Sequence, residues 1–365
     1  MKVVALDSHE QFARYADFPE KVYRENPFWV PVDPEHIIHL ISGEDDDDQI
    51  QVQPFWVEAD GQILATVTAI VYDRYNKKWN EQTGHLILFE ALPSSEPEVR
   101  ALIAEACRWI RSLGCNKVRA SMLLGWQLPW TIDAYDKVPT IFHTFNPDYY
   151  HGYIKSSGFF TEKGVVQYQV TFNSELRERY RGMQARAEES GVKLRAWDFD
   201  KLEEENELFT DLWNETFSNH WGGADIPSDR MAQLTVGMKD FLIPDFCVFA
   251  EVNGETAGIL YAAPDLNQAL HAARGKTGDK LDAAFRRAFS EIDHGVLLVI
   301  GVREGHRNKG VNLGMAAKSY LAMMDRGYTQ ASYTVVLDDN WPSRRTAEKL
   351  GCSVTRNFNV YAKSL

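Results

Sequence analysis

The stretch that decides the fold runs from His294 to Tyr328 and reads HGVLLVIGVREGHRNKGVNLGMAAKSYLAMMDRGY. Its apolar run Val296–Ile300 is short and rich in β-branched residues, which predicts a strand buried on both faces. A polar, cationic turn follows, and apolar residues then recur at helical spacing as far as a stop at Gly327. The sequence therefore predicts a strand, a glycine-bearing turn and an amphipathic helix in direct succession.

The turn between this strand and this helix has the properties of a phosphate site. The first N–H groups of a helix lack partners within the helix, and the helix dipole places partial positive charge at the same end. Gly305 and Gly310 allow a ligand to approach the backbone closely, and Arg307 and Lys309 add charge. Most such turns are plain surface turns, and this one matches neither G-x-x-x-x-G-K-[ST] nor G-x-G-x-x-G. We therefore expect a phosphate-binding turn of another kind.

Two motifs in this region resemble those of a known family. Residues Val302–Asn312, VREGHRNKGVN, resemble the [QR]-x-x-G-x-[GA] pyrophosphate loop of the GNAT-type N-acetyltransferases. Downstream, Gln330–Leu337 is predicted as a second strand, and a helix that ends at Gly351 follows it. The start of this helix is similar to the family's second coenzyme motif, N-x-x-[AS], with Asn340 and Ser343 in the matching places. Together the motifs cover roughly the last fifth of the chain.

The resemblance implies a site for acetyl-coenzyme A (acetyl-CoA), held mainly by backbone N–H groups. Two positions depart from the family pattern. Asn312 stands where the loop ends in a small residue, and Ala347 stands where many members have a tyrosine as general acid. The residues that the resemblance assigns to the coenzyme are Gly301, Val302, Arg307, Asn308, Lys309, Gly310, Val311, Asn312, Leu313, Asn340 and Ser343.

Acyl transfer to an amine also needs a group that takes the proton of the amine and a group that protonates the leaving thiolate. His220, in the glycine-ended loop SNHWGG at residues 218–223, is a candidate base or acceptor contact. A single histidine in a loop is more often structural or merely exposed. Tyr333, on the second predicted strand, is the other catalytic candidate, and a water molecule or no acid at all are alternatives to it.

Composition and charge limit the class of protein. The chain has 365 residues, of which 44% are hydrophobic, and this length favours two domains. The net charge of −13 disfavours a nucleic-acid partner. The four cysteines are scattered, and no His or Cys has zinc-site spacing, so no metal is expected. No apolar run approaches the ~20 residues of a membrane span, so we expect a cytoplasmic protein with no membrane partner. We also expect a monomer or a homodimer.

The two halves of the chain repeat the same order of predicted elements. A hairpin around Asp60–Gly61 is matched by one around Asn253–Gly254, and each is followed by an apolar strand, a turn and a helix. This order predicts an α/β fold with a mixed sheet, made of two GNAT-like domains in tandem, at residues 1–172 and 173–365. The first copy has the turn Glu90–Pro97, which is acidic and lacks arginine and glycine. We therefore predict that the first copy is degenerate and binds no coenzyme.

The sequence thus predicts an acyltransferase, specifically an N-acetyltransferase of the GNAT type. It would move an acetyl group from acetyl-CoA to the amine of a small-molecule or amino-acid-like acceptor. One alternative is a coenzyme A-binding module that has lost catalysis, as the absence of the tyrosine would allow. Another alternative keeps the fold but transfers an amino acid or a long acyl chain.

Overall fold

The computed structural model describes residues 1–43, 49–123 and 126–365. The contacts divide these residues into two compact units. Unit 1 consists of Met1–Val165, Gly222–Ala224 and Asn357–Leu365, and unit 2 consists of Val166–Trp221 and Asp225–Arg356. The division after Val165 lies close to the predicted boundary at residue 172, but the C-terminal residues, which the prediction placed in the second domain, fall in unit 1.

The sheet of unit 1 has the strand order β1-β2-β3-β4-β5-β13. Its strands are β1 (Lys2–Ala5), β2 (Ile50–Ala59), β3 (Gln62–Tyr72), β4 (Thr83–Ala91), β5 (Lys117–Ala120), the short β6 (Trp130–Thr131), which pairs with β13, and parts of β7 (Phe160–Thr171) and β13 (Ser353–Ser364). Its helices are α1 (His9–Ala16), α2 (Phe18–Val22), α3 (Pro34–Ser42), α4 (Asp73–Trp79), α5 (Glu96–Ser112) and α6 (Tyr150–Ser156). The β13–β5 pairing explains why the C-terminus belongs to this unit.

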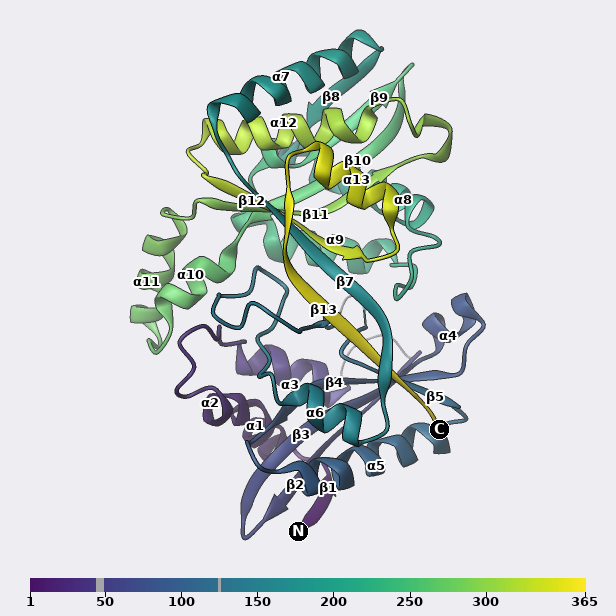
Figure 1. Ribbon diagram of the computed structural model, residues 1–365, viewed down its shortest axis with the longest axis vertical. Coiled ribbons are helices and arrows are strands. Elements are labelled where there is room, and N and C mark those ends of the chain that lie inside the picture. Colours follow the sequence, from purple (N-terminus) through teal and green to yellow (C-terminus); the bar gives the residue numbers. More distant parts are fainter. Residues whose placement is uncertain (44–48, 124–125) are drawn as a thin grey trace. The chain divides into compact units, whose positions relative to one another are not determined.

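Helices cover both faces of the unit 1 sheet, as Figure 1 shows. Alternate residues of a strand point to opposite faces. Phe55 and Val57 of β2 therefore join the core under α5, whereas Trp56 joins the core under α1 and α3. The hairpin predicted around Asp60–Gly61 is confirmed, since β2 and β3 pair on either side of it and both residues have positive φ.

The sheet of unit 2 has the order β7-β12-β11-β10-β9-β8. Its own strands are β8 (Val192–Ala196), β9 (Val248–Val252), β10 (Glu255–Pro264), β11 (His294–Val302) and β12 (Gln330–Leu337). Its helices are α7 (Ser174–Glu189), α8 (Leu202–Thr216), α9 (Ser228–Met238), α10 (Leu266–Ala273), α11 (Asp279–Phe289), α12 (Val311–Asp325) and α13 (Trp341–Lys349), with short 3-10 turns at Phe199–Lys201, Lys239–Phe241, Pro244–Phe246 and Glu304–His306. Helices α7 and α12 share one core with this sheet, and α8 belongs to a second core.

The predicted strand, turn and helix of residues 294–328 are confirmed as β11, a turn and α12. One detail of the prediction was wrong. Helix α12 is not clearly amphipathic, because residues on several of its sides, such as Met315, Ala316 and Tyr320, are buried. The physical reason is that α12 packs against α7 as well as against the sheet. The helical pair α10–α11, between β10 and β11, was not predicted.

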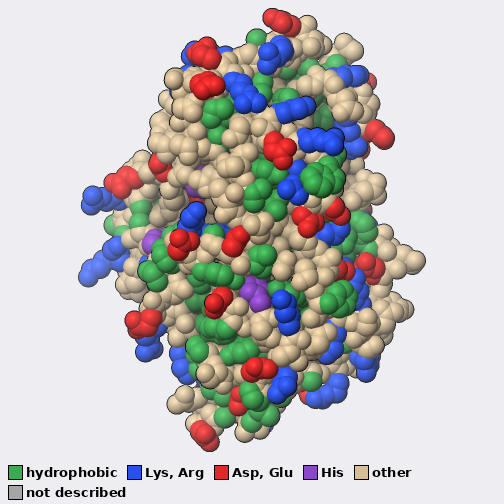
Figure 2. Space-filling view, viewed as in Figure 1, with side chains coloured by type: hydrophobic (Ala, Val, Ile, Leu, Met, Phe, Trp, Pro, Cys, Tyr) green, Lys and Arg blue, Asp and Glu red, His purple; other side chains and the backbone are tan. Residues whose placement is uncertain are grey.

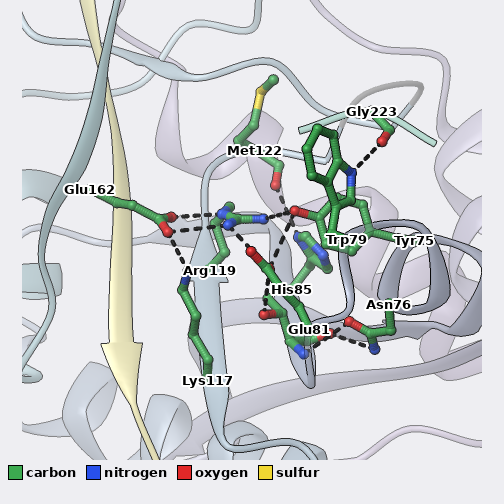
Figure 3. Close-up of polar contacts among 11 residues, drawn as sticks. Tyr75, Asn76, Trp79, Glu81, His85, Lys117, Arg119, Met122, Glu162 and Gly223 are labelled. Atoms are coloured by element: carbon green, nitrogen blue, oxygen red, sulfur yellow. Dashed lines mark hydrogen bonds and ion pairs between the residues drawn. The ribbon is translucent and has the colours of Figure 1, made fainter. Parts of the chain in front are cut away.

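A buried polar network joins the strands of unit 1, and Figure 3 shows how its side chains converge. The Arg119 side chain is fully buried, and it donates to Glu162 from Nε at 2.7 Å and from Nη2 at 3.1 Å. It also donates to the hydroxyl of Tyr75, and Lys117 pairs with the same Glu162. Burial acts to raise the pKa of Glu162, but the hydrogen bonds and charges of Arg119 and Lys117 hold it below its ordinary value.

The same network holds the segment Gly222–Ala224 within unit 1. The indole Nε1 of Trp79 donates to the Gly223 carbonyl at 2.7 Å. The ring of Tyr75 meets that of His85 edge to face, with centroids 5.0 Å apart, and His85 Nδ1 lies 3.1 Å from the Met122 carbonyl. Helix α4 is thus fixed to the sheet by polar contacts as well as by apolar packing.

Replacing Glu162 by glutamine should destabilise the protein, because it removes the nearer of the two carboxylates that face the buried Arg119 guanidinium and leaves only Glu81, at 3.5 Å from Nη2, as an ion-pair partner. We expect Glu162→Gln to lower the free energy of unfolding by about 3 kcal/mol at pH 7. Since the folded-state pKa of Glu162 is lowered, the wild type should lose this stabilisation as the pH falls through that pKa, and the two proteins should then converge. Urea unfolding followed by tryptophan fluorescence measures the difference, with the exposed Glu25→Gln as control. Equal stability of Glu162→Gln and wild type at pH 7 would contradict the prediction.

A second partly buried carboxyl group in unit 1, that of Glu90, should make stability depend on pH in the opposite direction. Glu90 of β4 accepts hydrogen bonds from the hydroxyls of Tyr23 and Tyr150, both at 2.6 Å. Burial of the carboxyl raises its pKa to about 7, although these two bonds lower it. The folded protein therefore holds a proton that the unfolded chain has already released, so stability should fall as the pH rises from 4.5 towards 7.

Glu90→Gln should remove this loss, because glutamine keeps an acceptor for the hydroxyls and carries no charge. We expect the variant to exceed the wild type in free energy of unfolding by about 2 kcal/mol at pH 8 and to match it near pH 4. Denaturant unfolding across this range gives the measurement. A pH profile with the same slope in both proteins would show that the folded form carries Glu90 ionised.

Candidate functional site

The parallel strands of unit 2 pair only over their first residues. The register of β11 and β12 runs from His294 opposite Gln330 to Leu297 opposite Tyr333, and both strands continue beyond that point. On its other edge β11 stays paired with β10 as far as Val302. The two parallel strands therefore part after Leu297, and the following residues of β11 have an edge that β12 does not pair.

Irregular backbone accompanies the end of this pairing. The β10–β11 register shifts between Tyr261 and Ala262, so that β11 has an extra residue at this point. In β12, Val335 has a φ of 57°, a left-handed conformation that is unfavourable for a β-branched residue. Both features are local departures from a regular ladder, and they occur where the two parallel strands part.

The turn after β11 leads directly into the start of α12. The Arg303 N–H donates to the Ala257 carbonyl at 2.9 Å, and the chain then makes the 3-10 turn Glu304–His306. Gly310 is the N-cap of α12, with a φ of 78°, and no atom lies within 4 Å of the position that a Cβ would take there. The backbone at this point is therefore open to a ligand, and glycine suits its left-handed conformation.

The first N–H groups of α12 are available to an anion. The Gly314 N–H donates to the Gly310 carbonyl at 2.9 Å, and no side chain caps this end of the helix. The N–H groups of Val311, Asn312 and Leu313 precede this first bond within the helix, so the helix itself gives them no acceptor. Together with the helix dipole they form the donor set that suits a phosphate group.

Two exposed cations lie over the same turn. The Arg307 Nε donates to the Val302 carbonyl at 3.1 Å, and the Lys309 Nζ donates to the Gly305 carbonyl at 2.9 Å. Asn308 between them has a φ of 63°, which asparagine tolerates better than most residues. These bonds hold both side chains against the turn, where their charge adds to that of the helix N-terminus.

The second motif forms a hydrogen-bonded chain that connects β12, α13 and α12. The Asn340 side chain caps α13 by accepting from the Ser343 N–H at 3.2 Å, and the Ser343 hydroxyl lies 2.8 Å from the Tyr333 hydroxyl. The Asn312 amide donates to the Thr346 hydroxyl at 2.8 Å. The structure therefore brings four of the predicted site residues into this chain, where their visible role is to position the two helix starts. Direct contact of Asn340 and Ser343 with a coenzyme stays a prediction.

The two catalytic candidates lie on different sides of the unit 2 sheet. Tyr333 is buried in the core that α12 shares with the sheet, and burial raises the pKa of its hydroxyl to about 12. It is therefore protonated at neutral pH. His220 follows α8 and lies beside Phe217, with ring centroids 5.6 Å apart. Ala347 is fully buried in the same core as Tyr333.

The end of α8 packs directly on the end of β11. A Cβ at Gly301 would lie 2.5 Å from the Thr216 hydroxyl and 3.1 Å from the Phe217 ring, so only glycine fits there. An ion pair between Arg303 and Glu215, at 3.0 Å, joins the same two elements. The sequence did not predict that Thr216 and Glu215 contact β11, because no local pattern connects these residues with a strand about 80 residues later in the chain. His220 is thus placed on the side of β11 that α8 covers.

Unit 1 repeats the strand geometry of unit 2. Its parallel pair β4–β5 runs from Thr83 opposite Lys117 to Leu86 opposite Ala120, and β4 continues to Ala91. The β3–β4 register also shifts, and Leu88 has a φ of 50° at that point. The same departure from a regular ladder therefore occurs in both units.

The turn that follows differs, because side chains of α6 fill it in unit 1. The Ala91 N–H donates to the Tyr150 hydroxyl at 2.8 Å, and the Ser95 N–H donates to the Tyr153 hydroxyl at 3.2 Å. Glu96 and Glu98 lie in the first turn of α5, where they would repel a phosphate. Glu90, the first acidic residue of the predicted turn, instead accepts hydrogen bonds from two tyrosine hydroxyls.

Two classes of site find no support in the part of the chain that the structure describes. No group of His, Cys, Asp and Glu side chains there has the arrangement of a metal site, and the four cysteines are buried free thiols. None of the helices within the described ranges is both long and apolar enough to cross a membrane.

Comparison with known proteins gives distant relatives that match along the whole chain. No family model matches it. The chain is 21% identical over 368 residues to the protein YghO of Escherichia coli (strain K12), which covers 95% of this chain and 91% of that protein. It is also 21% identical over 380 residues to the bacterial ceramide synthase of Caulobacter vibrioides (strain NA1000 / CB15N), which covers 100% of this chain and 98% of that protein.

A solved structure of similar architecture is the tandem GNAT protein from the clavulanic acid biosynthesis pathway, without AcCoA. It aligns over 100% of this chain and 98% of its own, with a TM-score of 0.57 and 11% identity. The likeness extends over both units, and their mixed sheets with helices on both faces agree with it. The chain therefore has the tandem GNAT-like fold, as the sequence predicted.

Proposed function

We propose that the chain is an N-acyltransferase that takes an acyl group from an acyl-coenzyme A thioester and passes it to an amine. The observation that carries this proposal is the end of β11–β12 pairing after Leu297 and Tyr333, immediately before an uncapped helix start with two exposed cations. The N–H groups of Val311–Leu313, with Arg307 and Lys309, would hold the diphosphate of the thioester. The unpaired edge of β11 would bind its extended arm.

The chemistry then needs a polarised carbonyl and a neutral amine. Backbone N–H groups near Gly301 and Val302 would hydrogen-bond to the thioester oxygen and stabilise the charge that develops there. The amine nitrogen forms the new C–N bond, the C–S bond breaks, and the thiolate leaves. His220, or a water molecule beside it, would accept the proton that the nitrogen loses. The thiolate takes its proton from solvent, because Ala347 supplies none.

A long-chain amino alcohol is the acceptor class that we favour. A ceramide is an amide between a fatty acid and such an amino alcohol, and the ceramide synthase relative is similar over the whole of this chain. This likeness supports a long acyl chain and a long-chain amine, in place of the acetyl group and the small or amino-acid-like amine that are expected from the sequence. The small amine stays as the second candidate, because the tandem GNAT-like fold is compatible with either.

The other candidate function is binding of coenzyme A without catalysis. It is favoured by the position of Ala347, which is buried in the core, and by the Tyr333 hydroxyl, which is engaged with Ser343. This candidate predicts the same coenzyme site and no release of thiol. The experiments below therefore separate binding from turnover.

Coenzyme A should bind through the α12 turn, with one molecule per chain. Isothermal titration should show that Arg307→Ala and Gly310→Asp each weaken binding by about tenfold or more, since each alters the charge at the diphosphate. Gly254→Asp is a matched control for the glycine, because Gly254 has a φ of 83° and an open surrounding in the same unit. Arg186→Ala, on the exposed side of α7, is the control for the arginine.

Unchanged affinity in both turn variants would remove the basis of the proposed function. Equal weakening in the Gly254→Asp control would instead assign the effect of Gly310→Asp to stability. A stoichiometry of two would contradict the degenerate reading of unit 1, where Tyr150 and Tyr153 accept from the backbone N–H groups of the corresponding turn.

Turnover should depend on the chain length of the acceptor. We expect thiol release from palmitoyl-coenzyme A to be faster with sphinganine than with ethanolamine, which has an amino alcohol group without the chain. The difference in kcat/KM should be at least about tenfold, since each buried methylene contributes about 0.8 kcal/mol to binding. His220→Ala should lower kcat and leave the affinity for coenzyme A unchanged.

Equal rates with ethanolamine and sphinganine would favour the small-amine acceptor. If no amine causes thiol release while coenzyme A still binds normally, the result would favour the binding module. A normal kcat in His220→Ala would exclude this histidine as the base.

A further inference from the structure

Unit 2 carries a helical hairpin, α10–α11, that has no counterpart between the corresponding strands in the described part of unit 1. It connects β10 to β11, whereas the corresponding strands β3 and β4 of unit 1 are connected by the single short helix α4. The two helices pack on each other, and Figure 1 shows them side by side next to the sheet of unit 2. The turn between them contains Gly275 and Gly278, both with positive φ, and the residues from Gly275 to Ala283 are all exposed.

Helix α11 has an apolar side that the protein leaves partly uncovered. Leu281, Phe285, Ala288 and Phe289 recur at helical spacing, yet no residue of this helix is buried. Phe285 and Phe289 lie beside Phe241, with ring centroids 5.6 and 5.8 Å away. Leu281, one turn before Phe285, is 36% exposed.

An exposed leucine of the neighbouring helix adds to this surface. Leu270 of α10 is also 36% exposed, although Ala269 beside it and Ala273 one turn later are fully buried. An amphipathic helix usually buries its apolar side within the protein. The hairpin instead presents two leucines to the outside, one on each helix.

The hairpin is also cationic in an acidic protein. The segment 274–287 contains five basic residues and two acidic residues, a net charge of +3, and the whole chain has −13, so the remainder carries −16. The charged residues of this segment are Arg274, Lys276, Lys280, Arg286 and Arg287, with Asp279 and Asp282. Figure 2 shows Lys and Arg side chains at the outer edge of the region that Figure 1 labels α10 and α11. Positive charge is thus concentrated where the apolar side is uncovered.

The positions of these cations on α11 match an interfacial helix. Lys280 and Arg287 are seven residues apart and so lie on one line along the helix, next to the line of Leu281 and Ala288. A helix of this type lies in the plane of a membrane surface, with its apolar side in the acyl boundary and its cations among the phosphate groups. Its 11 residues are about 16 Å long, which suits lying on a bilayer.

We propose that the α10–α11 hairpin is a docking surface for a bilayer that contains anionic lipids. Leu270 and Leu281 would enter the lipid interface, and the basic residues of segment 274–287 would meet the phosphate groups, each contributing about 1 kcal/mol of attraction. The remainder of the chain, with its net charge of −16, would be repelled by the anionic bilayer. The hairpin would therefore also orient the protein on the bilayer. This inference departs from the sequence expectation of no membrane partner, and it does not depend on the proposed function.

Vesicle co-sedimentation with the full chain tests this docking. We expect at least about tenfold more protein to bind to vesicles of phosphatidylcholine mixed with phosphatidylglycerol than to vesicles of phosphatidylcholine alone, and binding should fall as salt is added. The double variant Arg286→Glu and Arg287→Glu should abolish the preference. Leu281→Asp should weaken binding even at low salt, because it removes the apolar contact.

A control with the same change in total charge separates the hairpin from the protein as a whole. Arg179→Glu with Arg186→Glu reverses two exposed charges on α7 in the same unit and should bind vesicles as the wild type does. The thermal unfolding of each variant shows whether it is folded, which the exposed positions of the substituted residues favour.

Three results would overturn the proposal. They are equal binding to neutral and anionic vesicles, equal loss of binding in the α7 control, and no loss in either hairpin variant. If the chain stays in solution with anionic vesicles, an acidic protein becomes the partner to test for this surface. Because these measurements contain no thioester and no acceptor, their failure would leave the proposed acyl transfer unaffected.

Discussion

Backbone N–H groups without a partner inside the fold define the candidate binding site of unit 2. An N–H group that is removed from water needs an acceptor, and most such groups in a protein find one in a helix or a sheet. Here the β11–β12 ladder ends at Leu297, and the first turn of α12 has no side-chain cap. The strand edge and the helix start both come from the segment between β11 and α12. A ligand with an extended polar arm and a diphosphate supplies acceptors to both.

Unit 1 shows what happens when the protein satisfies those groups itself. Its strands β4 and β5 part in the same way, yet the hydroxyls of Tyr150 and Tyr153 accept from the N–H groups of the turn. The Tyr150 hydroxyl in turn donates to Glu90, so this turn is bound to the interior by a chain of hydrogen bonds. Similar strand geometry thus leaves the turn open in unit 2, where we propose a binding site, and leads to internal packing in unit 1. The side chains of α6 make the difference.

The sequence predicted the elements of the site well because local rules govern them. The β-branched run, the glycine turn and the helix spacing of residues 294–328 are all readable within one short window. The sequence could not predict contacts that join distant residues, such as Gly301 with Thr216 or Asn312 with Thr346. It also could not predict that residues 357–365 join unit 1, because the pairing of β13 with β5 depends on the fold of the first half. The sequence likewise counted Glu90 among the charges of an acidic turn, because its hydrogen bonds to Tyr23 and Tyr150 join residues that are far apart in the chain.

The absence of a tyrosine at Ala347 weighs less against catalysis than it would in other reactions. A thiol has a pKa of about 8.5, so a thiolate can leave at neutral pH without receiving a proton in the same step. An amine with a pKa near 10, in contrast, is mostly protonated at that pH and must lose a proton before it can attack. The step that most needs the protein is therefore removal of the proton from the amine and polarisation of the carbonyl. Under the proposed function both tasks would fall to the end of β11, where Gly301 meets the end of α8 and His220 lies beside Phe217.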